Sequence, residues 1–221
     1  MSGAGPGRPP DGEIPSPTRA LIDNRRYGWM LGGLALVLVL GFLVYSLTSN
    51  RSGSGTPGVP AGAQLRYFAA PLTASTLTGD ANLNPPCTLA RHDPRALNVC
   101  LLAKRGPLVL GFFVTGSSAC ERQVDTMQAL ASEPATRGVQ YAAVAVNTGH
   151  AAAAKAVRAN GWTIPVAYDA DGGVGSLYGV TACPLLELSY RGGTVASRLI
   201  GEHWLSPEAL AGQVRALLGR G

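Results

Sequence analysis

The pattern of hydrophobic positions opens with one long apolar block. Residues Gly28–Leu47 read GWMLGGLALVLVLGFLVYSL and contain no charged side chain. A helix of this length, rising ~1.5 Å per residue, covers the ~30 Å hydrocarbon core of a bilayer. The block therefore predicts a single transmembrane helix over residues 28–47.

Arginines flank this block unequally. Arg8, Arg19, Arg25 and Arg26 precede it, whereas only Arg51 follows closely. The positive-inside rule then places the N-terminus in the cytoplasm and the rest of the chain outside, as in a single-pass protein of the cell membrane. A cleaved signal peptide and a buried core helix are the alternatives. The block is long for a signal peptide, no A-x-A site follows it, and no polar residue interrupts it.

The segments on either side of the block differ in composition. Residues 1–27 are rich in Gly, Pro and Ser and predict a disordered cytoplasmic tail. Residues 48–64 have the composition of a flexible linker. Residues 65–221 are long enough to enclose one hydrophobic core, and we expect them to form one extracytoplasmic domain.

Within that domain, continuous apolar runs typical of buried strands alternate with segments of helical spacing. The expected strands are Pro107–Val114, Gly138–Val146, Ile164–Tyr168, Leu185–Tyr190 and Thr194–Ile200. The expected helices cover residues 118–133, 149–160 and 206–218. This order predicts an α/β fold in which a mixed central sheet carries helices on both faces.

Charge adds little to this picture. The net charge is +5, but no dense Lys/Arg block is interleaved with aromatic residues, so we expect no nucleic-acid partner. His92, His150 and His203 lack metal-ligand spacing, and Asp169 with Asp171 is better explained as part of a turn than as a calcium loop. We therefore expect neither a metal nor a cofactor.

The four cysteines Cys87, Cys100, Cys120 and Cys183 carry the candidate chemistry. An even number suits disulfides in an oxidising compartment. Cys87 and Cys100 bracket a loop of 12 residues, and a disulfide there would stabilise the domain by roughly 2–4 kcal/mol. Four cysteines allow three pairings, which the sequence alone does not separate.

Two stretches resemble the thioredoxin-like superfamily, in particular its membrane-anchored TlpA-type thiol-disulfide oxidoreductases and AhpC/TSA-like redoxins. Gly111–Cys120 (GFFVTGSSAC) resembles the active-site segment, where a strand leads into a Cys-x-x-Cys motif at the start of a helix. Tyr178–Gly201 resembles the cis-proline loop and terminal hairpin, with Pro184 at the cis-proline position. The likeness covers residues 97–219 and implies a thioredoxin-like fold.

The motif departs from that family at its first position. The chain has Ser117-Ser118-Ala119-Cys120, so Ser117 occupies the place of the attacking cysteine. A serine hydroxyl does not replace a thiolate in disulfide exchange at neutral pH. The ordinary Cys-x-x-Cys cycle is therefore unavailable.

The resemblance leaves three hypotheses for Cys120. In the first, Cys120 forms a redox couple with Cys183, since the residue before the cis-proline packs against the active-site cysteines in thioredoxin folds. Protein thiols or disulfides are then the substrates. We favour this pairing, with Cys87–Cys100 as a structural disulfide, although Cys87 or Cys100 is an alternative resolving thiol.

In the second hypothesis, Cys120 reduces peroxide alone, because its Ser-x-x-Cys setting at a helix start resembles that of peroxiredoxins. In the third, Cys120 is a buried apolar residue and the domain only binds a partner. Arg191 and Arg198 are further candidates, as cations that would stabilise a thiolate.

Overall fold

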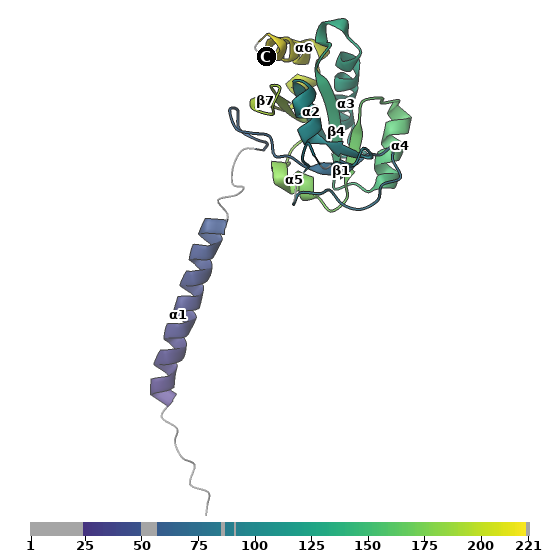
Figure 1. The fold of residues 1–221 in the computed structure, drawn as a ribbon. Coiled ribbons are helices and arrows are strands. Elements are labelled where there is room, and N and C mark those ends of the chain that lie inside the picture. The colour runs from purple at the N-terminus through teal and green to yellow at the C-terminus, as the bar shows by residue number, and fades with distance from the viewer. Residues whose placement is uncertain (1–23, 50–56, 85–86, 91, 220–221) are drawn as a thin grey trace, which may run out of the picture. The chain divides into compact units, whose positions relative to one another are not determined.

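The computed structural model of the chain describes residues 24–49, 57–84, 87–90 and 92–219 (Figure 1). Helix α1 covers Asn24–Ser49, so the expected helix over residues 28–47 forms. Its side chains are described over residues 29–42, and all of them are exposed. Among the described residues, no helix combines the length and hydropathy needed to cross a membrane. The expected tail, residues 1–27, lies almost wholly outside the described part.

The compact unit, Gly55–Gly221, is built on a five-stranded sheet of order β5-β4-β3-β6-β7. Its strands are β3 (Leu108–Phe113), β4 (Gln140–Val146), β5 (Val166–Asp169), β6 (Leu185–Ser189) and β7 (Val195–Ile200). Strands β3, β4 and β5 are parallel, whereas β6 is antiparallel to both β3 and β7. The expected mixed sheet is therefore confirmed.

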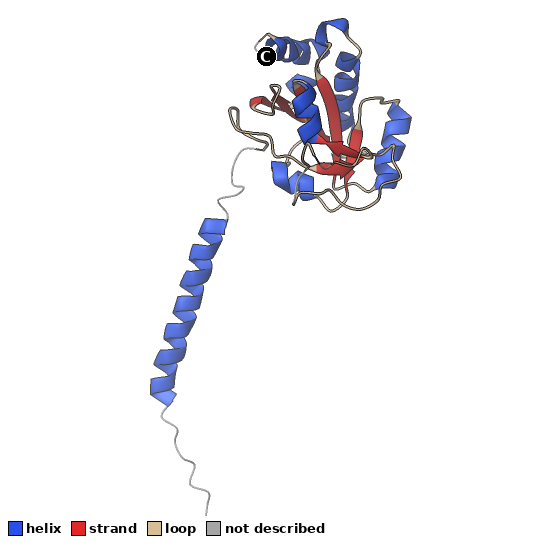
Figure 2. Cartoon of the chain, viewed as in Figure 1, coloured by secondary structure: helices blue, strands red, loops and turns tan. Residues whose placement is uncertain are grey.

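Helices cover both faces of this sheet (Figure 2). One face packs against α3 (Ser118–Ala131), α4 (His150–Asn160) and α6 (Pro207–Leu218). The other face packs against α2 (Val99–Arg105), α5 (Gly173–Tyr178) and residues before β3.

Strand β3 carries buried apolar side chains on both faces of the sheet. Val109 and Phe113 enter the cluster under α3, while Leu108, Leu110 and Phe112 enter the opposite one. All six residues of the strand are buried. A continuous apolar run is the sequence pattern of such a central strand.

Several short elements were not expected. These are β1 (Ala69–Pro71), β2 (Ala96–Asn98), α2, α5 and the 3-10 turns Pro134–Thr136 and Glu202–Leu205. Strands of three residues are too short to show a period. The turn expected at Asp169 and Asp171 runs directly into α5, whose glycines disfavour a helix on propensity alone.

The N-terminal boundary of the domain also differs from the expectation. The expected linker extends to residue 64, yet Val59 is only 2% exposed. The Gly62 N–H donates to the Val195 carbonyl at 2.8 Å, and the Val195 N–H donates to the Ala63 carbonyl at 2.8 Å. Residues 57–64 thus pack beside β7, and the folded part begins before residue 65.

Candidate functional site

Cys120 and Cys183 form a disulfide, with their Cα atoms 5.4 Å apart. The pairing follows from the sheet. Strand β3 runs toward α3, β6 begins just after Cys183, and Phe112 pairs with Leu185 in the antiparallel register. The end of β3 and the start of β6 therefore meet at one sheet edge, which brings together cysteines 63 positions apart.

The loop that carries Cys183 is held by a proline. The Cys183–Pro184 peptide bond is cis, as the resemblance implies. Pro184 is buried, and its carbonyl accepts a hydrogen bond from the Gly201 N–H at 3.1 Å. The chain just after Cys183 is thus fastened to the end of β7.

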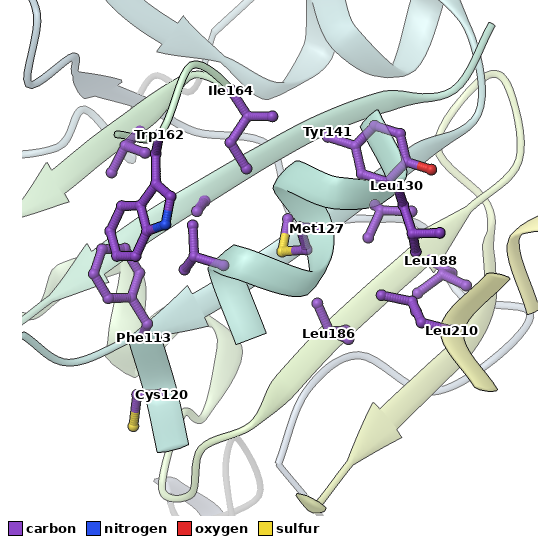
Figure 3. Packing of buried hydrophobic residues seen from close by; sticks show 14 of the residues in the cluster. Phe113, Cys120, Met127, Leu130, Tyr141, Trp162, Ile164, Leu186, Leu188 and Leu210 are labelled. Atoms are coloured by element: carbon purple, nitrogen blue, oxygen red, sulfur yellow. The ribbon is translucent and has the colours of Figure 1, made fainter. Parts of the chain in front are cut away.

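Cys120 lies in the first turn of α3, at the edge of the cluster beneath Phe113 (Figure 3). Phe113 meets Trp162 edge to face, with ring centroids 5.4 Å apart. The Trp162 indole N–H donates to the Asp125 carboxylate at 2.7 Å. These contacts fix α3 against the sheet independently of the disulfide.

Ser117 is the N-cap residue of α3, with extended backbone and no capping bond from its side chain. The Gly116 N–H instead donates to Glu121 Oε1 at 2.8 Å. Ser117 thus shares the helix end with Cys120 but supplies no thiol.

A buried carboxyl, Glu187, was missed by sequence reasoning. It lies in β6 and is fully buried. Burial raises its pKa to about 7, although the Val59 N–H, 2.6 Å from Oε1, and the charge of Arg198 lower it in part. Its Oε2 has no hydrogen-bond partner among the described residues. The single acid in the run LLELS was the available signal.

The two candidate arginines lie in different places. Arg198 pairs with Glu187 in the β6–β7 register. Arg191 lies in the β6–β7 turn, where its Nε–H donates to the Lys104 carbonyl at 3.0 Å. Arg191 is thus separated from Cys183 by the length of β6, ~17 Å for five residues.

Cys87 and Cys100 form the second disulfide, with Cα atoms 6.1 Å apart. Both residues are buried, and the Cys100 N–H donates to Cys87 Sγ at 3.1 Å. The bond lies beside a groove of about 520 Å³ that Arg191 also lines. All four cysteines are paired, and the partner of Cys120 is Cys183 rather than Cys87 or Cys100.

The aspartates near α5 accept hydrogen bonds from backbone N–H groups. Asp169 Oδ2 accepts from the Gly175 N–H at 2.9 Å, and Asp171 Oδ1 accepts from the Gly173 N–H at 3.1 Å. Burial raises the pKa of Asp169. Within the described ranges, no group of three or more His, Cys, Asp or Glu side chains is placed to hold a metal.

Residues 85–197 match the model of the AhpC/TSA family. The chain belongs to the AhpC/TSA family. The AhpC/TSA segment contains all four cysteines and Pro184, and it ends within β7. No curated protein matches the chain.

Solved structures resemble the AhpC/TSA chain in fold. A putative thiol:disulfide interchange protein DsbE from Chlorobium tepidum has 21% identity and a TM-score of 0.55, covering 75% of this chain and 100% of that one. A secreted Mycobacterium tuberculosis disulfide oxidoreductase homologous to E. coli DsbE has 19% identity and a TM-score of 0.52, covering 67% and 95%. Peroxidoxin BcpB from M. tuberculosis has 17% identity and a TM-score of 0.53, covering 75% and 98%. The fold is thus thioredoxin-like.

Proposed function

We propose that this chain is a membrane-anchored, extracytoplasmic thiol-disulfide oxidoreductase whose reactive pair is Cys120 and Cys183. The carrying observation is the disulfide between the first turn of α3 and the residue before the cis-proline. This is the place where thioredoxin-like folds hold reactive sulfur. Ser117 stands in the place of the first cysteine of the Cys-x-x-Cys motif. The second sulfur of the pair therefore comes from Cys183.

The reaction transfers two electrons. A substrate dithiol loses two electrons and two protons and becomes a disulfide, while the Cys120–Cys183 bond breaks and both sulfurs become thiols. Each step is the attack of a thiolate on a disulfide sulfur through a mixed disulfide. The reverse sequence reduces a substrate disulfide.

The membrane anchor is part of the same proposal. It is supported by the uncharged block Gly28–Leu47 and by the excess of arginines before it. In this proposal the cysteines lie outside the cytoplasm, where disulfides persist. Protease protection of a C-terminal tag in intact cells would test the orientation.

Peroxide reduction is a second candidate, favoured by membership of the AhpC/TSA family. Here the Cys120 thiolate attacks peroxide, giving water and a sulfenic acid, and Cys183 condenses with that acid to give the observed disulfide and a second water. Reduction of peroxide and reduction of a substrate disulfide therefore end in the same Cys120–Cys183 disulfide, and they differ in the oxidant.

One pair of assays separates the two candidates. The full chain in detergent is reduced and then offered either hydrogen peroxide or a peptide disulfide, while closure of Cys120–Cys183 is followed by peptide mapping. We expect the peptide disulfide to close the bond and peroxide to act far more slowly. Fast closure by peroxide alone would favour the second candidate, and no closure by either would contradict both.

A further inference from the structure

The two sulfurs of the reactive disulfide differ in exposure. Cys120 is 6% exposed and belongs to the buried cluster around Phe113. Cys183 is half-buried, and Thr181 and Ala182 just before it are exposed. A thiolate from solvent therefore reaches Cys183 more readily than Cys120, and access helps to decide which sulfur is attacked.

The two sulfurs also differ as leaving groups. Cys120 is the third residue of α3, a helix of 14 residues, so its sulfur lies near the free N–H groups and positive dipole end of that helix. This end stabilises a thiolate on Cys120, whereas Cys183 lies in a loop. A more stable thiolate leaves faster in disulfide exchange. The helix end offsets the cost of a thiolate in the apolar surroundings of Cys120, and exposure directs the incoming thiolate to Cys183.

Ser117 removes the sulfur that would otherwise compete with Cys183 for the substrate. In the resembled Cys-x-x-Cys motif, the first position is the exposed sulfur that meets the substrate. Here that position carries a half-buried hydroxyl, which forms no mixed disulfide. The substrate-facing sulfur must then come from another element, and Cys183 is the more exposed member of the only pair at this sheet edge.

We infer that Cys183 is the sulfur that exchanges with substrate and that Cys120 is the internal, resolving sulfur; this rests on the proposed function. A substrate thiolate bonds to Cys183 Sγ, and the Cys120–Cys183 bond breaks with its electron pair on Cys120. A second substrate thiolate then attacks the substrate sulfur, which releases Cys183 as a thiolate that takes up a proton. The substrate leaves as a disulfide, and the chain is reduced by two electrons.

The direct test uses the natural full chain in detergent. The oxidised chain is mixed with reduced glutathione, quenched with acid, alkylated with N-ethylmaleimide and mapped by peptide mass spectrometry. We expect glutathione on Cys183 and alkylation on Cys120, in at least about tenfold excess over the reverse arrangement. Equal labelling, or glutathione mainly on Cys120, would overturn the assignment while leaving the proposed function intact. No adduct on either sulfur, with the disulfide unchanged, would overturn both.

Two trap variants give a second measurement that does not depend on a transient species. With Cys87–Cys100 left intact, Cys120→Ser should accumulate a stable mixed disulfide with a peptide disulfide substrate through Cys183. The matched variant Cys183→Ser should form its adduct at least about tenfold more slowly. Comparable adduct rates in the two variants, both with native circular dichroism, would contradict the inference.

Discussion

The two disulfides of this chain join positions at very different separations. Cys87–Cys100 closes 13 positions and Cys120–Cys183 closes 63. On chain entropy alone, the first stabilises by about 3 kcal/mol and the second by about 4 kcal/mol. The bond that we propose to open in each catalytic cycle is therefore the one whose loss gives the unfolded chain more conformational entropy.

The contacts around Cys120–Cys183 explain how the folded domain keeps its structure when this bond opens. On one side of Cys120–Cys183, the Thr126 hydroxyl of α3 donates to the Leu205 carbonyl at 2.9 Å. On the other side, the Pro184 carbonyl accepts from Gly201. Both flanks are thus held by contacts that survive reduction. A reactive disulfide needs such independent support, whereas a structural one can itself be the support.

Removing each disulfide in turn and measuring thiol-disulfide exchange should separate the roles of the two bonds. Cys183→Ser should lower the rate of dithiol oxidation by at least about hundredfold, because no internal partner remains to be displaced. The double variant Cys87→Ser/Cys100→Ser should stay within about twofold of the natural chain, because its sulfurs lie at the other end of β6. A comparable loss in both variants would show that the two bonds are not functionally distinct.

The structural bond should contribute to stability rather than to exchange. The double variant Cys87→Ser/Cys100→Ser should lose about 3 kcal/mol of unfolding free energy. Urea titration followed by fluorescence of the buried Trp162 measures this change in the full chain. The Arg95–Asp93 pair within the loop, 2.8 Å apart, is exposed and should not compensate for the loss. A loss below about 1 kcal/mol would mean that local bonds already order the loop.

The elements around these bonds were not equally predictable. Strands β3 and β4 are apolar runs long enough to be recognised, and their order along the chain is typical of a mixed sheet. The position of Cys183 beside Cys120 came from the resemblance, because no local pattern connects residues 63 positions apart. The choice among three cysteine pairings needed the fold, since spacing constrains only short loops.

The order of residues 57–64 and helix α5 were both not predicted, for the same physical reason. Residues 57–64 have a linker's composition, yet backbone hydrogen bonds to β7 order them, and composition does not report such bonds. Helix α5 forms despite its glycines because Val174 and Tyr178 are buried on the sheet. Tertiary contacts override propensity at both places.

Glu187 lies on β6, the strand that runs from the reactive disulfide toward the structural one. Its pKa is raised to about 7, so the folded state favours the neutral carboxyl. Between pH 4.5 and pH 7 the folded chain binds more protons than the unfolded chain, and stability should fall as pH rises through this window, by about 2–3 kcal/mol.

The variant Glu187→Gln should abolish most of that slope and be at least as stable as the natural chain above pH 7. Urea titrations across the same pH range measure this. The matched variant Glu121→Gln, at the exposed Gly116 contact, should keep the slope. An unchanged slope in Glu187→Gln would assign the pH dependence to another group.

A variant at Ser117 tests whether this serine is what moves the reactive sulfur to Cys183. Ser117→Cys restores a Cys-x-x-Cys spacing with Cys120, so the new thiol competes for Cys120 and leaves Cys183 free. Insulin reduction should rise about tenfold, and glutathione should map to position 117 rather than to Cys183.

Ser118→Cys is the control for this gain, because it adds a thiol at the same exposed helix start. Residues two apart on a helix do not face each other, so this variant should leave Cys120–Cys183 in place and the rate within about twofold of natural. If Ser117→Cys retained the Cys120–Cys183 bond and gained no activity, the serine would not be the cause of the displaced pair.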